Sequence, residues 1–280
     1  MAIDFHCNFF TPEAFKKYWY EQEEMYRVIK WWHMEERTKG HTPDAFVAMM
    51  DEAGLDKALV PAIRMMSYQT KKMIWDIQEE EVSEVVKQHP GRLYGLAGFN
   101  PLEKMDGVRR VERAVRDLGF KGVYLHTYGF GVPLNDRIYY PLYAKCVELG
   151  VPVSMQVGHS AERMPSELGR PIHLDTIALD FPELKLVGAH TGWPWTEEMI
   201  ALAWKHENVY LGIDAHHPKY LEPSLLHFMK TRGQDKVVYG TNFPAVLHKD
   251  SIACIRTSIG LSEKVAEKIL HGNAARVYGL

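Results

Sequence analysis

The chain has 280 residues, 46% of them hydrophobic, and a formal net charge of −3 at pH 7. This length allows one α/β barrel or two smaller domains. The small net charge argues against a nucleic-acid partner or an anionic membrane surface. No run approaches the roughly 20 apolar residues of a membrane span. The first residues include neither a basic stretch nor a long apolar one, so the cytoplasm is the expected location.

Three cysteines, Cys7, Cys146 and Cys254, are widely spaced along the chain. An odd number without close spacing argues against a disulfide framework or a thiolate zinc site. We expect Cys7 to be a buried thiol beside the functional site rather than a nucleophile.

Short apolar and β-branched runs alternate with amphipathic stretches. The runs predict strands over residues 2–7, 57–63, 92–98, 122–126, 151–157, 185–190, 208–214 and 236–240. The amphipathic stretches predict helices near residues 43–53, 70–88, 103–118, 137–149, 168–181, 195–205, 219–231 and 246–258. Eight such βα units predict a (β/α)8 TIM barrel, with residues 1–280 in a single domain. An open doubly wound sheet is the alternative, but the G-x-G-x-x-G turn it often carries is missing.

Capping residues support several of these boundaries. Gly54, Gly119 and Gly150 each precede a predicted strand, at the position where a glycine commonly ends the helix before it. Thr42 followed by Pro43 is typical of an N-cap and a first helical residue.

Residues 9–41 form an insertion between the first predicted strand and the first regular helix. The insertion is rich in aromatic residues: Phe9, Phe10, Phe15, Tyr18, Trp19, Tyr20, Tyr26, Trp31 and Trp32. Extra loops at the carboxyl-terminal face of a barrel commonly build the substrate pocket. The insertion is therefore a candidate lid over a pocket, with packing on the barrel or contact with a second subunit as alternatives.

Polar residues end five of the predicted strands. These residues are His6, His126, His159, His190 and Asn242. In a parallel barrel the strand ends converge on one face, where such enzymes carry out their chemistry. The repeated position favours a functional site over scattered structural histidines, most clearly for His6, His159 and His190.

Imidazoles and a carboxylate are a common ligand set for a catalytic divalent metal. His6 and His159 offer two nitrogens, and Asp4 has the same strand phase as His6. Asn242 would complete such a shell only weakly, because a neutral amide offers one carbonyl oxygen and no charge.

Five motifs extend over the chain: IDFH (3–6), GFKGVYLH (119–126), FPELKLVGAHTG (181–192), YGTNFP (239–244) and ILHGNAAR (269–276). With them the chain resembles the amidohydrolase-related metalloenzymes of the aminocarboxymuconate-semialdehyde decarboxylase group, which includes resorcylate and carboxyvanillate decarboxylases. The resemblance covers essentially the whole chain, and its motifs are poor at identifying a substrate.

The resemblance implies roles for the matching residues. His6 matches the first histidine of the family's H-x-H pair, and His159 matches the metal ligand after the fifth strand. His190 matches the sixth-strand histidine that serves the decarboxylases as general acid/base. Arg64 lies where family members often place an arginine for a substrate carboxylate, a task that suits a planar guanidinium. The alternative for Arg64 is an ion pair.

The chain departs from the family pattern at two metal-ligand positions. Asn8 stands where the second histidine of H-x-H is expected, and Asn242 stands where the family has the aspartate of G-T-D-F-P. In hydrolytic members that aspartate is both a metal ligand and a proton acceptor. Both a single divalent metal, such as zinc held by Asp4, His6 and His159, and a metal-free site are therefore open hypotheses.

The leading functional hypothesis is a lyase, most simply a decarboxylase, that acts on a small carboxylated ring or unsaturated acid. The candidate catalytic residues are His190, His159 and Asn242. The candidate substrate-binding residues are Arg64, Asn8, His126, Trp193 and Asp214.

Three alternatives remain. A hydrolase, for example of a lactone, would need His159 or Asp214 as the base, since Asn242 cannot act as one. A non-catalytic binding protein would keep the barrel without the chemistry. A hydratase or a carbon–carbon lyase is also compatible with these residues. The family resemblance implies a homodimer or larger homo-oligomer.

Overall fold

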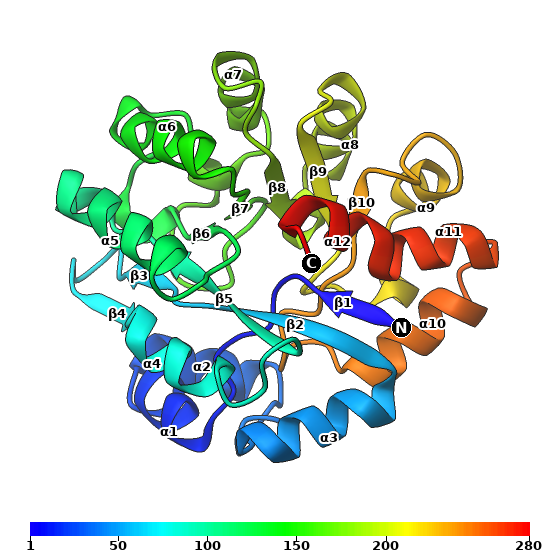
Figure 1. The fold of residues 1–280 in the computed structure, drawn as a ribbon, viewed down its shortest axis with the longest axis horizontal. Helices are drawn as coiled ribbons and strands as arrows, with labels where there is room; N and C mark the ends of the chain where they lie inside the picture. Colours follow the sequence, from blue (N-terminus) through cyan, green and yellow to red (C-terminus); the bar gives the residue numbers. More distant parts are fainter.

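The structure is a computed structural model that describes residues 1–280. Eight parallel strands form one curled sheet in the order β1-β2-β5-β6-β7-β8-β9-β10, surrounded by helices (Figure 1). The strands are β1 (Ala2–Asp4), β2 (Leu55–Pro61), β5 (Leu93–Gly98), β6 (Val123–Leu125), β7 (Val153–Gln156), β8 (Leu186–Ala189), β9 (Val209–Gly212) and β10 (Val237–Val238). All eight predicted strands are confirmed.

Backbone hydrogen bonds join the first strand to the last beyond their regular ends. The amide of Phe5 donates to the carbonyl of Tyr239 at 3.2 Å. The amide of Asn242 then donates to the carbonyl of His6 at 2.8 Å, and that of Asn8 donates to Phe243 at 3.2 Å. These bonds bring the residues after β1 and β10 together, which places Asn8 beside Asn242.

A helix follows each strand on the outside of the sheet. These helices are α3 (Pro43–Ala53), α4 (Glu79–Val86), α5 (Met105–Arg116), α6 (Tyr140–Leu149), α7 (His173–Asp180), α8 (Thr196–Lys205), α9 (Pro223–Lys230) and α10 (His248–Thr257). The chain ends with α11 (Glu263–Glu267), a π-helical turn (Lys268–Gly272) and α12 (Asn273–Tyr278). The side chain of Thr42 caps α3 as expected, and Gly54 and Gly150 end α3 and α6 in the left-handed conformation.

One helix prediction was wrong over much of its length. Residues 70–88 contain a helix only at α4, because the preceding residues form an antiparallel hairpin of β3 (Arg64–Met66) and β4 (Met73–Asp76). The indole of Trp75 is buried against Trp19, with ring centroids 5.1 Å apart. The partner for this apolar run therefore comes from the segment 9–41, which a local sequence pattern does not reveal.

The segment 9–41 folds into α1 (Pro12–Phe15), a π-helical turn (Lys16–Tyr20) and α2 (Glu23–Trp31). Figure 1 shows α1 and α2 beside α4 and the hairpin. The ring of Phe10 stacks on Phe46 of α3 at 3.8 Å, and Tyr18 donates to Glu81 at 2.6 Å. Its aromatic residues divide into two groups: five are buried (Phe9, Phe10, Phe15, Tyr18, Trp19), and four are exposed (Tyr20, Tyr26, Trp31, Trp32).

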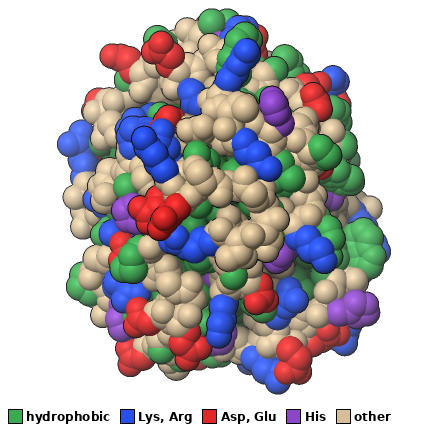
Figure 2. Space-filling model, turned by 90° about the vertical axis from the view of Figure 1, so that its right-hand side faces the viewer, with side chains coloured by type: hydrophobic (Ala, Val, Ile, Leu, Met, Phe, Trp, Pro, Cys, Tyr) green, Lys and Arg blue, Asp and Glu red, His purple; other side chains and the backbone are tan.

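On the face drawn in Figure 2, basic and acidic side chains are interleaved, so this face offers no broad patch of one charge. None of the helices combines the length and the apolar character that crossing a lipid bilayer requires.

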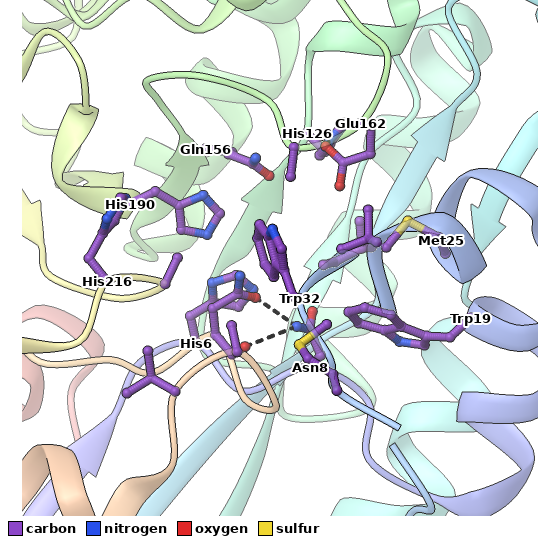
Figure 3. A pocket seen from close by; sticks show the side chains of 18 of the residues that line it. His6, Asn8, Trp19, Met25, Trp32, His126, Gln156, Glu162, His190 and His216 are labelled. Atoms are coloured by element: carbon purple, nitrogen blue, oxygen red, sulfur yellow. Dashed lines mark hydrogen bonds and ion pairs between the residues drawn. The ribbon is translucent and has the colours of Figure 1, made fainter. Parts of the chain in front are cut away.

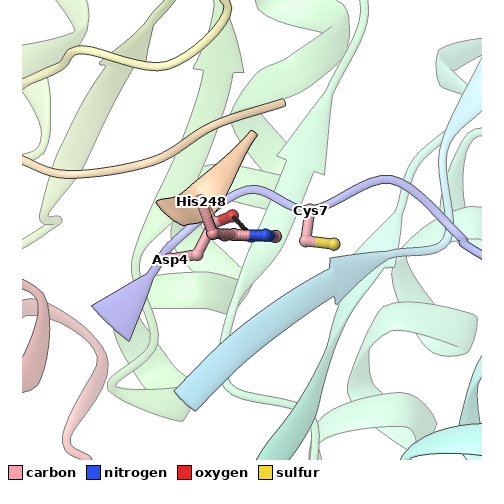
Figure 4. A group of neighbouring side chains, drawn as sticks. All are labelled: Asp4, Cys7 and His248. Atoms are coloured by element: carbon pink, nitrogen blue, oxygen red, sulfur yellow. Dashed lines mark hydrogen bonds and ion pairs between the residues drawn. The ribbon is translucent and has the colours of Figure 1, made fainter. Parts of the chain in front are cut away.

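The carboxylate of Asp4 ties the end of β1 to the end of β10. Its Oδ1 accepts from the amides of His6 and Thr241, each at 3.0 Å. Its Oδ2 accepts from the hydroxyl of Thr241 and from Nε2 of His248, the latter at 2.8 Å. Figure 4 shows His248 and Cys7 beside it. A buried carboxylate with four donors is a strong constraint on local structure.

The substitution Asp4→Asn should lower the free energy of unfolding by about 3 kcal/mol, because it leaves buried donors facing an amide group. Urea denaturation followed by circular dichroism measures this change. Asp44→Asn is the matched control, since the side chain of Asp44 is 91% exposed and a surface change of this kind alters stability by less than about 0.5 kcal/mol. Equal losses in the two variants would contradict the role of Asp4.

Candidate functional site

A cavity of about 650 Å³ lies at the carboxyl-terminal ends of the strands. Its polar wall comes from residues that follow β1, β6, β7, β8, β9 and β10: His6, Asn8, His126, His159, Glu162, His190, His216 and Asn242. Its apolar wall includes Trp19, Met25 and Trp32 from the segment 9–41 (Figure 3). The cavity size suits a small organic molecule, and the predicted convergence of strand ends is confirmed.

The carboxylate of Asp214, which follows β9, holds two histidines of the cavity. Its Oδ2 accepts from Nδ1 of His6 at 2.7 Å, and its Oδ1 accepts from the backbone amide of His190, also at 2.7 Å. Nε2 of His190 lies 3.2 Å from the same Oδ2. The contact is not a hydrogen bond, so Nε2 of His190 is a buried ring nitrogen without a hydrogen-bond partner.

Burial alone would raise the pKa of Asp214, but its contacts with His190 and His6 outweigh burial and hold the pKa well below the usual range. Burial lowers the pKa of His6, and Asp214 offsets this only in part. Burial and the nearby His190 lower the pKa of His216 to about 4. At neutral pH the site therefore combines an ionised carboxylate with neutral His6 and His216.

Strained backbone conformations are concentrated at the carboxyl-terminal end of the barrel. Four non-glycine residues there have positive φ angles: His190 (62°), Thr191 (56°), Ala215 (65°) and Asn242 (51°). Such conformations cost roughly 1–3 kcal/mol each and persist where the surrounding structure enforces them, often at functional sites. The strain is a signal of function that no local sequence pattern showed.

Several buried polar atoms at the cavity wall have no protein partner. They are Nε2 of His6, Oδ1 of Asn8, the hydroxyl of Tyr124 and both ring nitrogens of His126. Leaving a buried donor or acceptor unsatisfied costs about 1–3 kcal/mol. Their presence around one cavity is the pattern expected when a polar ligand supplies the missing hydrogen bonds.

A second histidine–carboxylate pair belongs to the same cavity. Nε2 of His126 lies 3.8 Å from Oε2 of Glu162, and Glu162 also accepts from the hydroxyl of Ser160 at 2.6 Å. Burial alone would raise the pKa of Glu162, but the interactions with His126 and Ser160 outweigh burial and lower the pKa to about 2. Glu162 is therefore an anion at neutral pH.

The two asparagines at the site bind each other. The side-chain amide of Asn8 donates to Oδ1 of Asn242 at 2.6 Å (Figure 3). This bond uses one of the two lone pairs on the amide oxygen of Asn242, and neither asparagine brings a charge to the site.

The predicted metal set does not fit a divalent cation. The carboxylate of Asp4 accepts hydrogen bonds from His6, Thr241 and His248, behind the cavity wall. The compact groups of potential ligands are His6 with His190 and Asp214, and Asp4 with Cys7 and His248, so Asp4, His6 and His159 are not brought together. In the first group the carboxylate of Asp214 already accepts hydrogen bonds from the ring of His6 and the backbone amide of His190, and no member of the second group lines the cavity.

Three further predictions about the site need correction. Arg64 does not line the cavity; its guanidinium is buried and paired with Glu79 at 2.7 Å and Asp76 at 2.8 Å, so its charge is already neutralised. Trp193 also lies outside the cavity lining, and its carbonyl accepts from the amide of His159 at 2.7 Å. Asp214 is fully buried, is not part of the cavity lining, and binds His6 and His190.

Sequence reasoning missed Arg37, the one arginine or lysine in the cavity lining. Arg37 lies in the segment 9–41, and its guanidinium donates to the carbonyl of Ala245 at 3.2 Å. It also missed Gln156, Tyr124 and Glu162. Gln156 and Tyr124 lie within predicted strands and could have been found by strand phase, whereas Arg37 and Glu162 lie in loops without such a signal.

Comparison with known proteins gives two sequence matches. The sequence profile of the amidohydrolase family matches residues 3–280. A 2-keto-4-carboxy-3-hexenedioate hydratase from a Sphingobium species is 35% identical over 130 residues, which is 40% of this chain. The match spans only 38% of that curated relative.

Solved structures resemble the whole chain. An uncharacterised TIM-barrel protein from Bordetella bronchiseptica superposes with a TM-score of 0.78 at 24% identity, over 99% of this chain and 98% of the other. A 5-carboxyvanillate decarboxylase from Novosphingobium aromaticivorans, in complex with manganese and 4-hydroxy-3-methoxy-5-nitrobenzoic acid, gives a TM-score of 0.74 at 18% identity, over 100% and 96% of the two chains. At these identities the likeness establishes the TIM-barrel fold alone.

Proposed function

The chain belongs to the amidohydrolase family, and we propose that it is a lyase, most simply a decarboxylase, for a small carboxylated aromatic or unsaturated acid. The observation that carries this proposal is His190, which lines the cavity with its backbone amide bound to Asp214 and its imidazole Nε2 3.2 Å from the same carboxylate. An imidazole is the side chain that most often transfers protons in enzymes, and proton delivery to carbon is the step that a decarboxylase needs. The likeness to a 5-carboxyvanillate decarboxylase supports the same reaction class.

The apolar wall supports loss of carbon dioxide. Trp19, Met25 and Trp32 of the segment 9–41 face the polar strand ends, so an aromatic ring would lie between them and His190. A carboxylate that loses its hydration in such a cavity is less stable than neutral carbon dioxide. We assign this segment as a lid over the substrate, and contact with a second subunit through its exposed aromatic residues stays a prediction.

We assign recognition of the acid at the cavity mouth to Arg37, in place of Arg64. It is the one guanidinium or ammonium group in the lining, and its side chain is exposed. A guanidinium at the rim attracts carboxylates without stabilising the acid deep in the cavity, where carbon dioxide must leave.

Substitution of His190 by Asn should lower kcat by about 10²-fold or more while the acid still binds, since it removes the proton donor and keeps the shape of the site. Carbon dioxide release from a panel of hydroxylated aromatic and unsaturated acids gives kcat, and calorimetry gives binding. His227→Asn is the control, because His227 is exposed on α9. Full activity in the His190 variant would remove this residue from the mechanism.

Substitution of Arg37 by Met should raise KM severalfold with little change in kcat, because it removes the positive charge that draws the acid to the cavity mouth and leaves the reacting groups unchanged. Steady-state kinetics on the best acid of the panel measures both constants. Lys39→Met is the matched control; Lys39 is exposed and pairs with Glu36. A fall in kcat at constant KM would contradict the assignment.

We infer that the reaction proceeds without a bound cation, because the carboxylates of Asp4 and Asp214 accept hydrogen bonds from their neighbours and the side chain of Asn8 donates to that of Asn242. Elemental analysis should find metal well below one equivalent, and chelators should leave kcat unchanged. The double variant N8H/N242D should gain thermal stabilisation by zinc, about 2.7 kcal/mol at 100 times Kd. Stoichiometric metal in the unaltered protein, with activity lost on its removal, would refute this proposal.

Addition of water to an unsaturated acid is the second candidate. The hydratase relative favours it, although only 130 residues are matched. A hydratase would bleach the ultraviolet absorbance of a conjugated acid without releasing carbon dioxide, so both products are measured in the same assay.

A further inference from the structure

The proposed function uses His190 and leaves a second buried acid–base pair in the same cavity unexplained. His126 follows β6 and is only 4% exposed, and both of its ring nitrogens lack a hydrogen-bond partner. Glu162, in the loop after β7, lies 3.8 Å from its Nε2. An imidazole buried beside a carboxylate with nothing bound to either nitrogen is costly unless a ligand uses it.

The other neighbours of His126 form no hydrogen bond with its ring nitrogens. The ring of Tyr128 packs edge-on at 5.1 Å, and its hydroxyl donates instead to the carbonyl of Gly158 at 3.0 Å. The hydroxyl of Tyr124 has no partner of its own. Glu162 lies within ion-pair distance of the His126 ring, and it accepts from Ser160, which orients its carboxylate.

We propose that His126, supported by Glu162, takes the proton from a hydroxyl group of the substrate while His190 protonates the substrate carbon. This inference rests on the proposed decarboxylase function and narrows its substrates to acids that carry a phenol or enol hydroxyl. Figure 3 shows His126 with Glu162 and His190 with His216 as separate groups around the cavity.

The substrate O–H bond breaks, and its proton passes to the imidazole of His126. The electron pair left on oxygen then makes the ring carbon that bears the carboxylate more nucleophilic. That carbon forms a C–H bond with the proton of His190, and the bond to the carboxylate then breaks to release carbon dioxide. His126 returns its proton to the oxygen, and His190 takes one proton from solvent, so one proton is consumed for each carbon dioxide released.

The role of Glu162 follows from its charge. An imidazolium in a low-dielectric cavity is unfavourable unless an anion lies close to it. Glu162 stays ionised at neutral pH because its pKa is lowered to about 2. Glu162 is therefore a positioning residue that stabilises the charged form of His126, whereas His126 itself touches substrate.

A nitrophenol that carries a carboxylate tests the proposal without turnover. The probe is 4-hydroxy-3-nitrobenzoate, whose phenolate absorbs visible light and whose phenol does not. Bound to the unaltered protein, its phenol should ionise at a pH at least about one unit below that in H126N, because the proton acceptor is present. In E162Q the midpoint should lie between these two values. The variant E167Q is the control, since Glu167 is on the surface and pairs with Arg170.

The outcomes separate this inference from the proposed function. If H126N and E162Q remain folded by circular dichroism, bind the probe and ionise it at the same pH as the unaltered protein, the role of His126 is refuted, while release of carbon dioxide that depends on His190 would keep the proposed function. If ionisation depends on His126 but no hydroxylated acid loses carbon dioxide, the proton acceptor stands and decarboxylation fails. A probe that does not bind the unaltered protein would overturn both.

Discussion

The structure of the site depends on one buried carboxylate, that of Asp214. An anion with no exposure to water is stable only when several donors surround it. Its donors are the ring of His6 after β1 and the backbone amide of His190 after β8, which are 184 positions apart in a 280-residue chain. Satisfying this charge fixes the two histidines relative to each other.

The cavity built on this constraint has two polar ends and an apolar wall. His190 with Asp214 and His126 with Glu162 are two imidazole–carboxylate pairs of similar chemistry in different surroundings. Asn8 and Asn242 lie beside them and bind each other, so they contribute shape and hydrogen bonding but no charge. The proposed chemistry is therefore proton transfer, beside an apolar wall that includes residues of the segment 9–41.

Much of the fold could be predicted, because each element has a strong local signal. The eight strands followed from short apolar runs, and α3 followed from Thr42 and Gly54 at its two ends. The prediction over residues 70–88 was wrong because Trp75 pairs with Trp19 from a distant segment. A short apolar run takes the conformation that buries it best, and the surface available for burial is decided by the tertiary structure.

The sequence by itself determined the family, the parallel strands and the histidines at their ends, since strand phase and motif depend on neighbouring residues. Only the tertiary structure decided which charged side chains are paired with each other and which remain available to a substrate. Arg64 and Arg37 are alike as residue types, but Arg64 is neutralised by Glu79 and Asp76, whereas Arg37 reaches the cavity. Asp4 was expected to bind a metal, but its carboxylate binds Thr241 and His248 instead. A charged side chain that forms an ion pair is no longer available to a ligand, and its partner can lie anywhere in the chain.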